Sequence, residues 1–288
     1  MELLVTVSII ALLIAILLPA FSAAQNIAFR IKGVVNQRNT VTALNIFAND
    51  YNNRYPPSIA TMGTSPDEGE KNKWNWADPR LITGYPNCYE PRMSAGGHRS
   101  LGAYMNSYIE NPEILYCNSS PGEFPYWQQA WEAGDDWDHP GSPQDGDPVS
   151  GTYCFYWNYT GYLSETEKAF RGPRSTSSGG RGRSTILLSD YFGANTWRNE
   201  EEYGSSQIFK GAGSTESSNY YADFWTGGDA EGSKPDIKLS AAYVDGHAEY
   251  YDSDEVVTME IINRDESEVF DPEVGKGKFF LPEACLPY

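Results

Sequence analysis

Residues 3–21 form an almost unbroken apolar run, LLVTVSIIALLIAILLPAF, and a single carboxylate, Glu2, precedes it. This run is long enough to cross a bilayer, because ~20 helical residues at ~1.5 Å each match a hydrocarbon core of ~30 Å. An ionisable group within such a segment costs roughly 2.5–3.5 kcal/mol at the bilayer centre, so it marks either a functional contact or the membrane interface. We therefore expect the chain to begin with a helix that is kept away from water.

Two interpretations follow from the apolar run alone. A cleavable secretory signal would end near Ser22-Ala23-Ala24, but such a signal begins with Lys or Arg, and this chain begins with Glu2. A plain transmembrane anchor explains the length of the run but does not explain the glutamate.

The start of the chain also resembles type IV pilins and the pseudopilins of type II secretion systems. The resemblance is carried by Glu2-Leu3-Leu4-Val5, by the Ile/Leu/Ala run, and by Pro19, which stands seventeen residues after the glutamate as in that family. On this alignment Met1 takes the Ile/Met position before the glutamate. The basic leader, the peptidase-site glycine and three mature residues would then precede this numbering.

This resemblance implies a function and a set of partners. The subunit would be anchored in the inner membrane, processed by a prepilin peptidase and polymerised by assembly machinery into an extracellular helical filament of identical copies. Glu2 would pair with the N-terminal amine of a neighbouring subunit and set the axial step. The residues expected to form the contact between subunits are Glu2, Leu3, Leu4, Val5, Ile9, Leu12, Leu13, Ile16 and Pro19.

A second apolar pattern continues the helix beyond Pro19, which should kink it. Polar residues such as Gln25, Gln37 and Asn45 are expected on the water side, and Pro56 and Pro57 end the pattern. The apolar residues recur at three- and four-residue steps, the period of one helix face, and are Phe21, Ile27, Ile31, Val34, Val41, Leu44, Phe47, Ala48 and Tyr51.

The pattern predicts two regions. Residues 1–54 form a helical stalk, with 1–24 in the membrane or filament core and 25–54 as an amphipathic half under the head. Residues 55–288 form a globular extracellular head rich in β-structure. The fold class is α+β: a long N-terminal helix, kinked near Pro19, packed on a loop-rich antiparallel sheet.

Several segments of the head favour strands. Aromatic or β-branched runs at 152–159 and 184–189 predict two strands, and 256–262 predicts an edge strand. The clearest hairpin joins 238–244 to 247–251 through Asp245-Gly246, a pair suited to the two positive-φ positions of a type I′ turn. The acidic segment 132–148 is expected to be an exposed loop.

Short islands of the head resemble large prepilin-like proteins of planctomycetes. These islands are 115–119, 187–190 and 242–249, and the last contains the strand-turn-strand sequence Asp245-Gly246-His247. That group often has a histidine ten residues before the aspartate, where this chain has Pro235. Any role of that histidine therefore does not carry over.

The charge balance excludes a nucleic-acid-binding face and argues against docking of the head on anionic lipid. The chain has 39 acidic and 21 basic residues, a formal net charge of -18. Binding to nucleic acid or to anionic lipid requires clustered Lys and Arg, so neither partner is expected. Acidic heads repel one another, and assembly must be driven by the stalk or by bridging cations.

The four cysteines form no CxxC pair, which disfavours a zinc ribbon. In an exported head, two disulfides are expected, and three connectivities remain open. Pilins commonly carry a bridge near the chain end, and that resemblance favours pairing Cys88 with Cys117 and Cys154 with Cys285.

A calcium site is one interpretation of the acidic loop. Carboxylate oxygens at high density can hold Ca²⁺, and some pseudopilins fix a loop in this way. The spacing does not match an EF-hand, and a solvated acidic loop is the alternative. The candidate ligands are Asp135, Asp136, Asp138, Asp145 and Asp147, and no other cofactor is indicated.

No catalytic motif is present in the sequence. It has three histidines and no HExxH, GxSxG or Walker pattern, so we expect a structural protein and not an enzyme. Asp245 and His247 could form an acid–base pair, although turn geometry also explains the Asp-Gly.

Three functions remain in competition. The first is a surface pilin, and the second is a periplasmic pseudopilin of a type II secretion system. The third is a membrane-anchored carbohydrate-binding or adhesin module that works as a monomer. For this module, Trp127, Trp131 and Trp137 could stack on sugars, or they could belong to the core.

Overall fold

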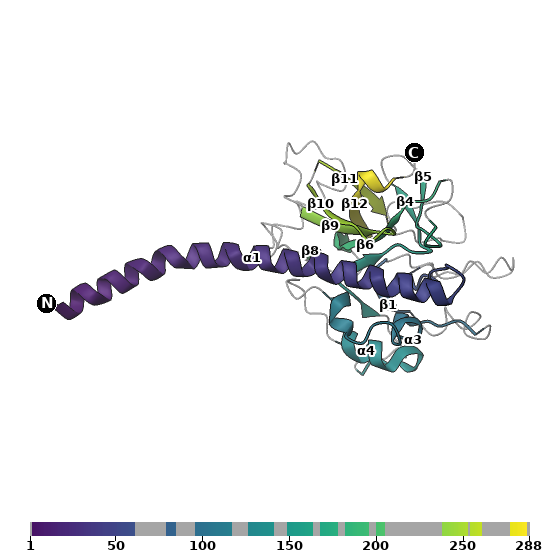
Figure 1. Cartoon of the computed structure of the whole chain (residues 1–288), viewed down its shortest axis with the longest axis horizontal. Helices are drawn as coiled ribbons and strands as arrows, with labels where there is room; N and C mark the ends of the chain where they lie inside the picture. The colour runs from purple at the N-terminus through teal and green to yellow at the C-terminus, as the bar shows by residue number, and fades with distance from the viewer. Residues whose placement is uncertain are drawn as a thin grey trace.

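Helix α1 runs without interruption from Glu2 to Asp50 and dominates the shape of the molecule (Figure 1). The computed structural model describes residues 2–60, 79–84, 96–116, 126–140, 149–163, 168–177, 182–195, 200–204, 238–252, 254–260 and 277–286. Pro19 lies inside α1 without ending it, and Figure 1 shows the helix bowed over its first half. A proline removes one backbone donor, and here the helix continues past Pro19 without breaking.

The described part of the head contains short helices and antiparallel strands. The helices are α3 (Leu101–Met105) and α4 (Trp127–Ala133), with 3₁₀ turns η1 (Pro112–Leu115), η2 (Gly134–Asp136) and η3 (Glu283–Cys285). The strands are β1 (Leu81–Thr83), β2 (Val149–Ser150), β3 (Tyr153–Phe155), β4 (Thr160–Leu163), β5 (Lys168–Arg171), β6 (Ile186–Asp190), β7 (Phe192–Asn195), β8 (Glu200–Gly204), β9 (Lys238–Tyr243), β10 (Ala248–Asp252), β11 (Val256–Glu260) and β12 (Gly277–Pro282).

These strands pair into three antiparallel sheets. One sheet has four strands in the order β10-β9-β6-β3, and a second has six in the order β5-β4-β11-β12-β7-β8. Strands β1 and β2 form a small third sheet. The fold is therefore α+β, a long helix packed on antiparallel sheet, as the sequence predicts.

In the four-stranded sheet, β3, β6 and β9 are buried on both faces, whereas most residues of the edge strand β10 are exposed. In β3, Tyr153 and Phe155 belong to the core cluster that includes α1, whereas Cys154 between them belongs to the cluster shared with Phe279 of β12. Successive side chains of a strand point to opposite faces, so this alternation places the sheet between the helix and the six-stranded sheet. A strand covered on both sides needs apolar residues at every position, which explains the continuous aromatic run.

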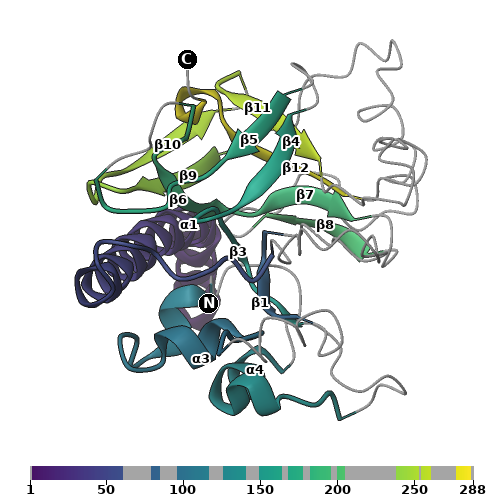
Figure 2. The ribbon, with the colours of Figure 1, turned by 90° about the vertical axis from the view of Figure 1, so that its right-hand side faces the viewer.

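Helix α1 passes between the two halves of the head (Figures 1 and 2). Strands β6, β9 and β10 contact one side of it, and α3 and η1 contact the other. Its buried residues near the C-terminal end include Val41, Leu44 and Phe47, all in the same cluster as the sheet. The second half of α1 is thus part of the core of the head.

Burial along α1 corrects part of the predicted helix face. Val41, Leu44, Phe47 and Ala48 are buried as expected, but the apolar face does not continue toward the stalk. The side chains of Phe21, Ile27 and Ile31 are 57–63% exposed because the head covers α1 only from about Gly33 onward. Tyr51, which follows the last residue of α1, is 54% exposed. Gln37, expected on the water side, is fully buried.

Three further predictions about the head were wrong. Strand β11 lies between β4 and β12 and is not an edge strand. The aromatic run 152–159 is not one strand, since β3 ends at Phe155 and β4 begins at Thr160. The acidic segment begins as α4 and η2 and not as a loop.

The β9–β10 hairpin is present, but its turn is not type I′. The backbone N–H of Gly246 donates to the carbonyl of Tyr243, and Tyr243 N–H donates to the carbonyl of His247. Only Gly246 has a positive φ, +90°; Asp245 does not. This pattern is a three-residue loop with glycine at the left-handed bulge position.

Candidate functional site

The most unusual surface of the molecule is the first half of α1. Its large apolar side chains from Leu3 to Phe21 are 50–80% exposed, although they cover every side of the helix. An apolar surface of this size is not stable in water and must be covered by lipid or by protein. By length and composition this helix can cross a membrane. We call residues 3–21 the apolar stalk.

All the predicted assembly residues except Glu2 lie on the apolar stalk. Leu3, Leu4, Val5, Ile9, Leu12, Leu13 and Ile16 are each more than half exposed, and Pro19 lies within the helix. The backbone of Glu2 begins α1, but its side chain is outside the described atoms, so its pairing role stays a prediction.

Polar residues within the apolar stalk are satisfied by the helix itself. The hydroxyl of Thr6 donates to the carbonyl of Leu3 at 2.9 Å, and the hydroxyl of Ser8 donates to that of Leu4 at 2.7 Å. Such back-bonding hides a hydroxyl from an apolar environment. The apolar stalk can therefore face lipid or another stalk without leaving these two hydroxyl groups unpaired.

A buried polar cluster fixes the stalk to the head. Gln37 Nε2 donates to Asp190 Oδ1 at 3.1 Å and to the Ser240 hydroxyl at 2.7 Å. Asp190 Oδ2 accepts from the backbone N–H and the hydroxyl of Ser240 at 3.1 and 2.7 Å. All three residues are at most 1% exposed. Because buried polar groups are costly when unpaired, this cluster specifies one register of α1 on the sheet.

The C-terminal end of α1 is held by further contacts. Asn45 Nδ2 donates to the carbonyl of Val244 at 3.2 Å, and Tyr55 OH donates to Asn45 Oδ1 at 2.8 Å. The hydroxyl of Tyr108 donates to Asp50 at 2.9 Å. The stalk is consequently continuous with a rigid body and is not tethered to it by a flexible linker.

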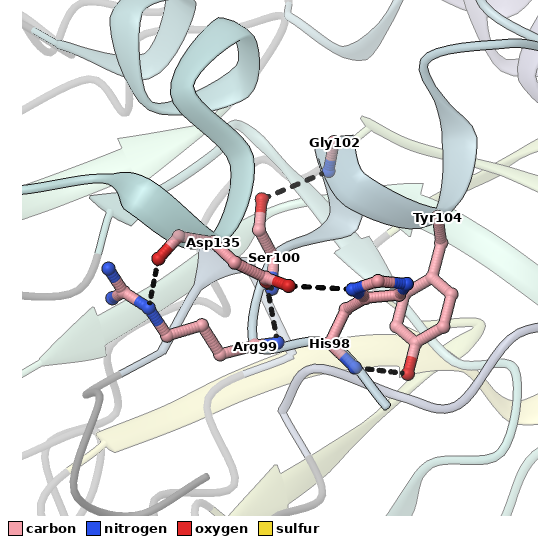
Figure 3. Close-up of polar contacts among 6 residues, drawn as sticks. All are labelled: His98, Arg99, Ser100, Gly102, Tyr104 and Asp135. Atoms are coloured by element: carbon pink, nitrogen blue, oxygen red, sulfur yellow. Dashed lines mark hydrogen bonds and ion pairs between the residues drawn. The ribbon is translucent and has the colours of Figure 1, made fainter. Parts of the chain in front are cut away.

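A second polar cluster lies on the α3–α4 side of the head and is drawn in Figure 3. The Asp135 carboxylate accepts from the backbone N–H groups of Arg99 and Ser100 at 2.9 and 3.1 Å, and its other oxygen lies 2.6 Å from Nδ1 of His98. Arg99 Nε donates to the Asp135 carbonyl at 2.9 Å. These contacts join the segment before α3 to η2.

The chemistry of this second cluster is structural. A His–Asp pair can activate a nucleophile, but the Ser100 hydroxyl caps α3 by accepting from Gly102 N–H at 3.1 Å (Figure 3). The edge of the Tyr104 ring packs against the ring of His98, with centroids 4.7 Å apart. The cluster is therefore a clamp between two segments of the chain.

Asp245 and His247 contact each other within the turn between β9 and β10. Asp245 Oδ1 accepts from the backbone N–H of His247 at 3.1 Å and contacts the ring Nδ1 of the same residue. Partial burial of Asp245 opposes ionisation, yet these hydrogen bonds lower the pKa of its carboxyl. The His247 ring stacks on Tyr243, with centroids 4.3 Å apart. A side chain that accepts from the N–H two residues later is a common turn motif.

The cysteines do not form the predicted C-terminal bridge. Cys154 and Cys285 are buried thiols in the cluster around Tyr156, without a disulfide between them. Burial raises the pKa of Cys285 to about 12. Cys88 and Cys117 lie outside the described residues.

The calcium hypothesis gains no support from the part of the chain that the structure describes. Among those residues, no group of three or more His, Cys, Asp or Glu side chains could hold a metal ion. Asp135 already uses both carboxylate oxygens in hydrogen bonds. Asp136 and Asp138 belong to the described residues and follow Asp135 closely in the sequence, whereas Asp145 and Asp147 lie outside the described residues. Calcium binding therefore stays a prediction.

The tryptophans act mainly in packing. Trp131 and Trp137 are 4% and 5% exposed and cannot stack on a sugar at the surface. Trp127 is partly buried and stacks on Tyr116, with ring centroids 5.3 Å apart. The sugar-binding interpretation is wrong for Trp131 and Trp137.

Comparisons of the chain with protein-family models, with curated proteins and with solved structures give no match. The structural findings are a long apolar N-terminal helix and a small antiparallel sheet packed on it. This arrangement is compatible with a pilin-like or a membrane-anchored protein. Sequence reasoning missed the buried polar cluster, because a lone Gln on a helix resembles a surface residue.

Proposed function

We propose that this chain is the structural subunit, or pilin, of a type IV pilus-like filament on the cell surface. The observation that carries the proposal is α1: one 49-residue helix whose apolar first half projects from the head and whose second half is built into it. The projecting part, residues 3–29, is ~40 Å long at ~1.5 Å per residue. That length suits the core of a filament.

The driving force is the burial of the apolar stalk. Before assembly, the stalk lies in the inner membrane with the head outside. Leaving lipid for water would cost ~1.5–3 kcal/mol for each Leu or Ile side chain. Packing against the stalks of earlier subunits keeps the same side chains out of water, so the filament core replaces the bilayer.

The junction between stalk and head favours a filament over a simple anchor. A monomeric anchored module needs only ~20 apolar residues, and a flexible linker can join it to its head. Here the helix continues rigidly into the core, and Gln37 fixes its orientation against Asp190 and Ser240. Every head in a filament must take the same orientation relative to its stalk, and this junction supplies that constraint.

The same features also serve a periplasmic pseudopilin of a type II secretion system. Processing by a prepilin peptidase and addition by assembly machinery belong to either version. The two versions differ in where the filament forms and how long it grows.

The test combines fractionation with electron microscopy of the cells that make this protein. In Glu2→Ala the chain should remain in the membrane fraction, and filaments should be lost, because the acid no longer pairs with its neighbour's amine. Glu2→Asp, which keeps the charge, is the matched control and should retain filaments. Abundant normal filaments from Glu2→Ala would refute the pairing role. A wild-type protein that stays monomeric in detergent under all conditions would refute the filament function, and short fibres confined to the periplasm would indicate a pseudopilin.

A further inference from the structure

Four arginines gather at the end of the head farthest from the stalk: Arg54, Arg171, Arg174 and Arg183. Backbone contacts bring their segments together. Arg54 forms a β-bridge with the residue that follows Arg174, Tyr55 N–H donates to the Arg174 carbonyl at 3.0 Å, and the residue after Arg183 donates to the Arg171 carbonyl at 2.8 Å. We call this group the distal arginine cluster.

The positive charge of this cluster is not neutralised within the described part of the chain. Arg54, Arg171 and Arg174 are exposed, and none of the ion pairs among the described residues involves any of the four arginines. Burial, followed by the charges of Arg174 and Arg171, lowers the pKa of Arg183. Asp50, the last residue of α1, accepts a hydrogen bond from Tyr108 and forms no ion pair with these arginines among the described residues.

Acidic residues gather at the other end of the head. Asp252, Asp254, Glu255 and Glu283 are all exposed. Glu255 N–H donates to the Asp252 carbonyl at 2.9 Å, and Glu283 N–H donates to the Glu255 carbonyl at 2.8 Å. Lys238, 2.5 Å from Asp252, is the basic partner that the described residues supply there. We call these four residues the stalk-side acidic end.

The strand register of the six-stranded sheet places the two groups at opposite ends. Arg171 pairs with Thr160 at the start of β4. The last residue of β4, Leu163, pairs with Met259 of β11, and Val256 at the start of β11 lies farther still from Arg171. The acidic residues 254 and 255 immediately precede Val256.

The contacts of α1 show which end faces the stalk. Gln37 contacts Ser240, and Asn45, farther along α1, contacts Val244. Strand β9 therefore runs beside α1 in the same direction. Asp252 pairs with the first residue of β9 and thus lies toward the stalk. Figure 1 shows β5 on the side of the head away from the N-terminus of α1.

We propose that the distal arginine cluster of one copy of this chain docks on the stalk-side acidic end of the next copy along the filament. The inference rests on the proposed filament function. Two different patches at opposite ends form a heterologous contact, which repeats into an open helical assembly instead of closing as a dimer. It also explains how chains of net charge -18 can come together, because a positive surface of one copy meets a negative surface of the next.

The test is a charge exchange in filaments sheared from cells. The first variant, Arg171→Glu with Arg174→Glu, and the second, Asp254→Lys with Glu255→Lys, should each lower the filament yield by ~10-fold or more, because like charges then face each other. The combined variant restores opposite charges and should return the yield to near the wild-type level. Arg171→Lys with Arg174→Lys is the matched control and should leave the yield unchanged.

Salt provides an independent measurement. Exposed charges are screened over ~8 Å at 0.15 M salt and ~3 Å at 1 M, so wild-type filaments should shorten as salt rises. Unchanged yield and salt response in the arginine variant would overturn the docking contact and leave the filament function standing. Loss of filaments that the combined variant does not restore would also overturn it, since the arginines would then face another partner. No filaments from the wild type would overturn the proposed function itself.

Discussion

The side-chain amide of Gln37 donates a hydrogen bond to the buried carboxylate of Asp190, with a nitrogen–oxygen distance of 3.1 Å. This bond joins α1 to the end of β6, 153 residues farther along the chain. Around it the helix is packed by apolar side chains, which are tolerant of small rotations and slides. The hydrogen bond is directional, and it selects one orientation of the stalk relative to the head.

Removing this amide should weaken the junction. In Gln37→Ala, Asp190 keeps its two contacts from Ser240 but loses one donor, and a buried acceptor left short of a partner costs about 1–3 kcal/mol. We expect the free energy of unfolding to fall by that amount in denaturant titrations of the detergent-solubilised chain. Arg38→Ala, an exposed change one position away, is the control and should stay within ~0.5 kcal/mol of the wild type. Equal losses in both variants would contradict the role of Gln37.

Two glycines should respond oppositely to alanine. A Cβ at Gly172 would lie 1.6 Å from the carbonyl oxygen of Tyr156, so Gly172→Ala forces the backbone apart and should cost about 3 kcal/mol. At Gly33 the nearest atom, the hydroxyl of Tyr153, is 3.9 Å from the new carbon, and alanine is the better helix former by ~0.5–1 kcal/mol. Thermal unfolding should therefore show a large drop in Tm for the first variant and none for the second. A lower Tm in both variants would contradict the prediction that a methyl group fits at Gly33.

The cysteine thiols should be inert in the folded protein. Cys285 is fully enclosed and its pKa is raised to about 12 by burial, so almost no thiolate exists near neutral pH. We expect peptide mapping after iodoacetamide treatment to find Cys154 and Cys285 unlabelled in the native chain and labelled after unfolding. Discovery of a peptide pair linked through these two cysteines would show that the bridge implied by the pilin resemblance forms after all.

Alkaline pH should destabilise the head. Burial raises the pKa of Tyr156 well above its ordinary value of ~10, as it raises that of Cys285 above ~8.5. Above those ordinary values the unfolded chain releases protons that the folded chain retains. Stability is therefore complete below about pH 8.5 and is lost as the pH rises, by up to ~1.4 kcal/mol per pH unit for each group.

Tyr156→Phe separates this effect from a loss of packing. The variant loses the 3.0 Å hydrogen bond to Ser189 and should be less stable at neutral pH. Because it has no buried phenol at this position, its free energy of unfolding should fall less steeply above about pH 10 than that of the wild type. Parallel curves for the two proteins would rule out Tyr156 as a source of the pH dependence.

The parts of this fold that sequence reasoning captured are local. The length of α1 follows from consecutive apolar residues and from Pro56 and Pro57, and the β9–β10 hairpin follows from Asp245-Gly246 between two strand patterns. The turn type was wrong because one left-handed residue, Gly246, suffices when the loop carries a bulge.

What escaped sequence reasoning depends on contacts between distant segments. The amide of Gln37 can be buried because Ser240 and Asp190 lie opposite it and accept its hydrogen bonds. The spacing of apolar residues along a helix does not predict such distant polar partners. The interior place of β11 depends on which strands pair beside it, and a short apolar run does not specify that. The arginines of the distal cluster come from three segments that only the fold brings together.

The boundary of the stable head should lie within α1 and not at its end. The head buries Val41, Leu44 and Phe47 in its main core cluster, and each such side chain is worth ~1.5–3 kcal/mol away from water. A fragment that begins at residue 55 loses all three together with Gln37, a loss comparable with the ~5–15 kcal/mol that stabilises a typical domain. We expect this fragment to be unfolded or aggregated by circular dichroism and size-exclusion chromatography. A fragment that begins at residue 30 lacks the apolar stalk, keeps every buried contact from Gly33 onward, and should be a soluble folded monomer. If the shorter fragment folded as well as the longer one, the helix would be an attachment to the head and not part of its core.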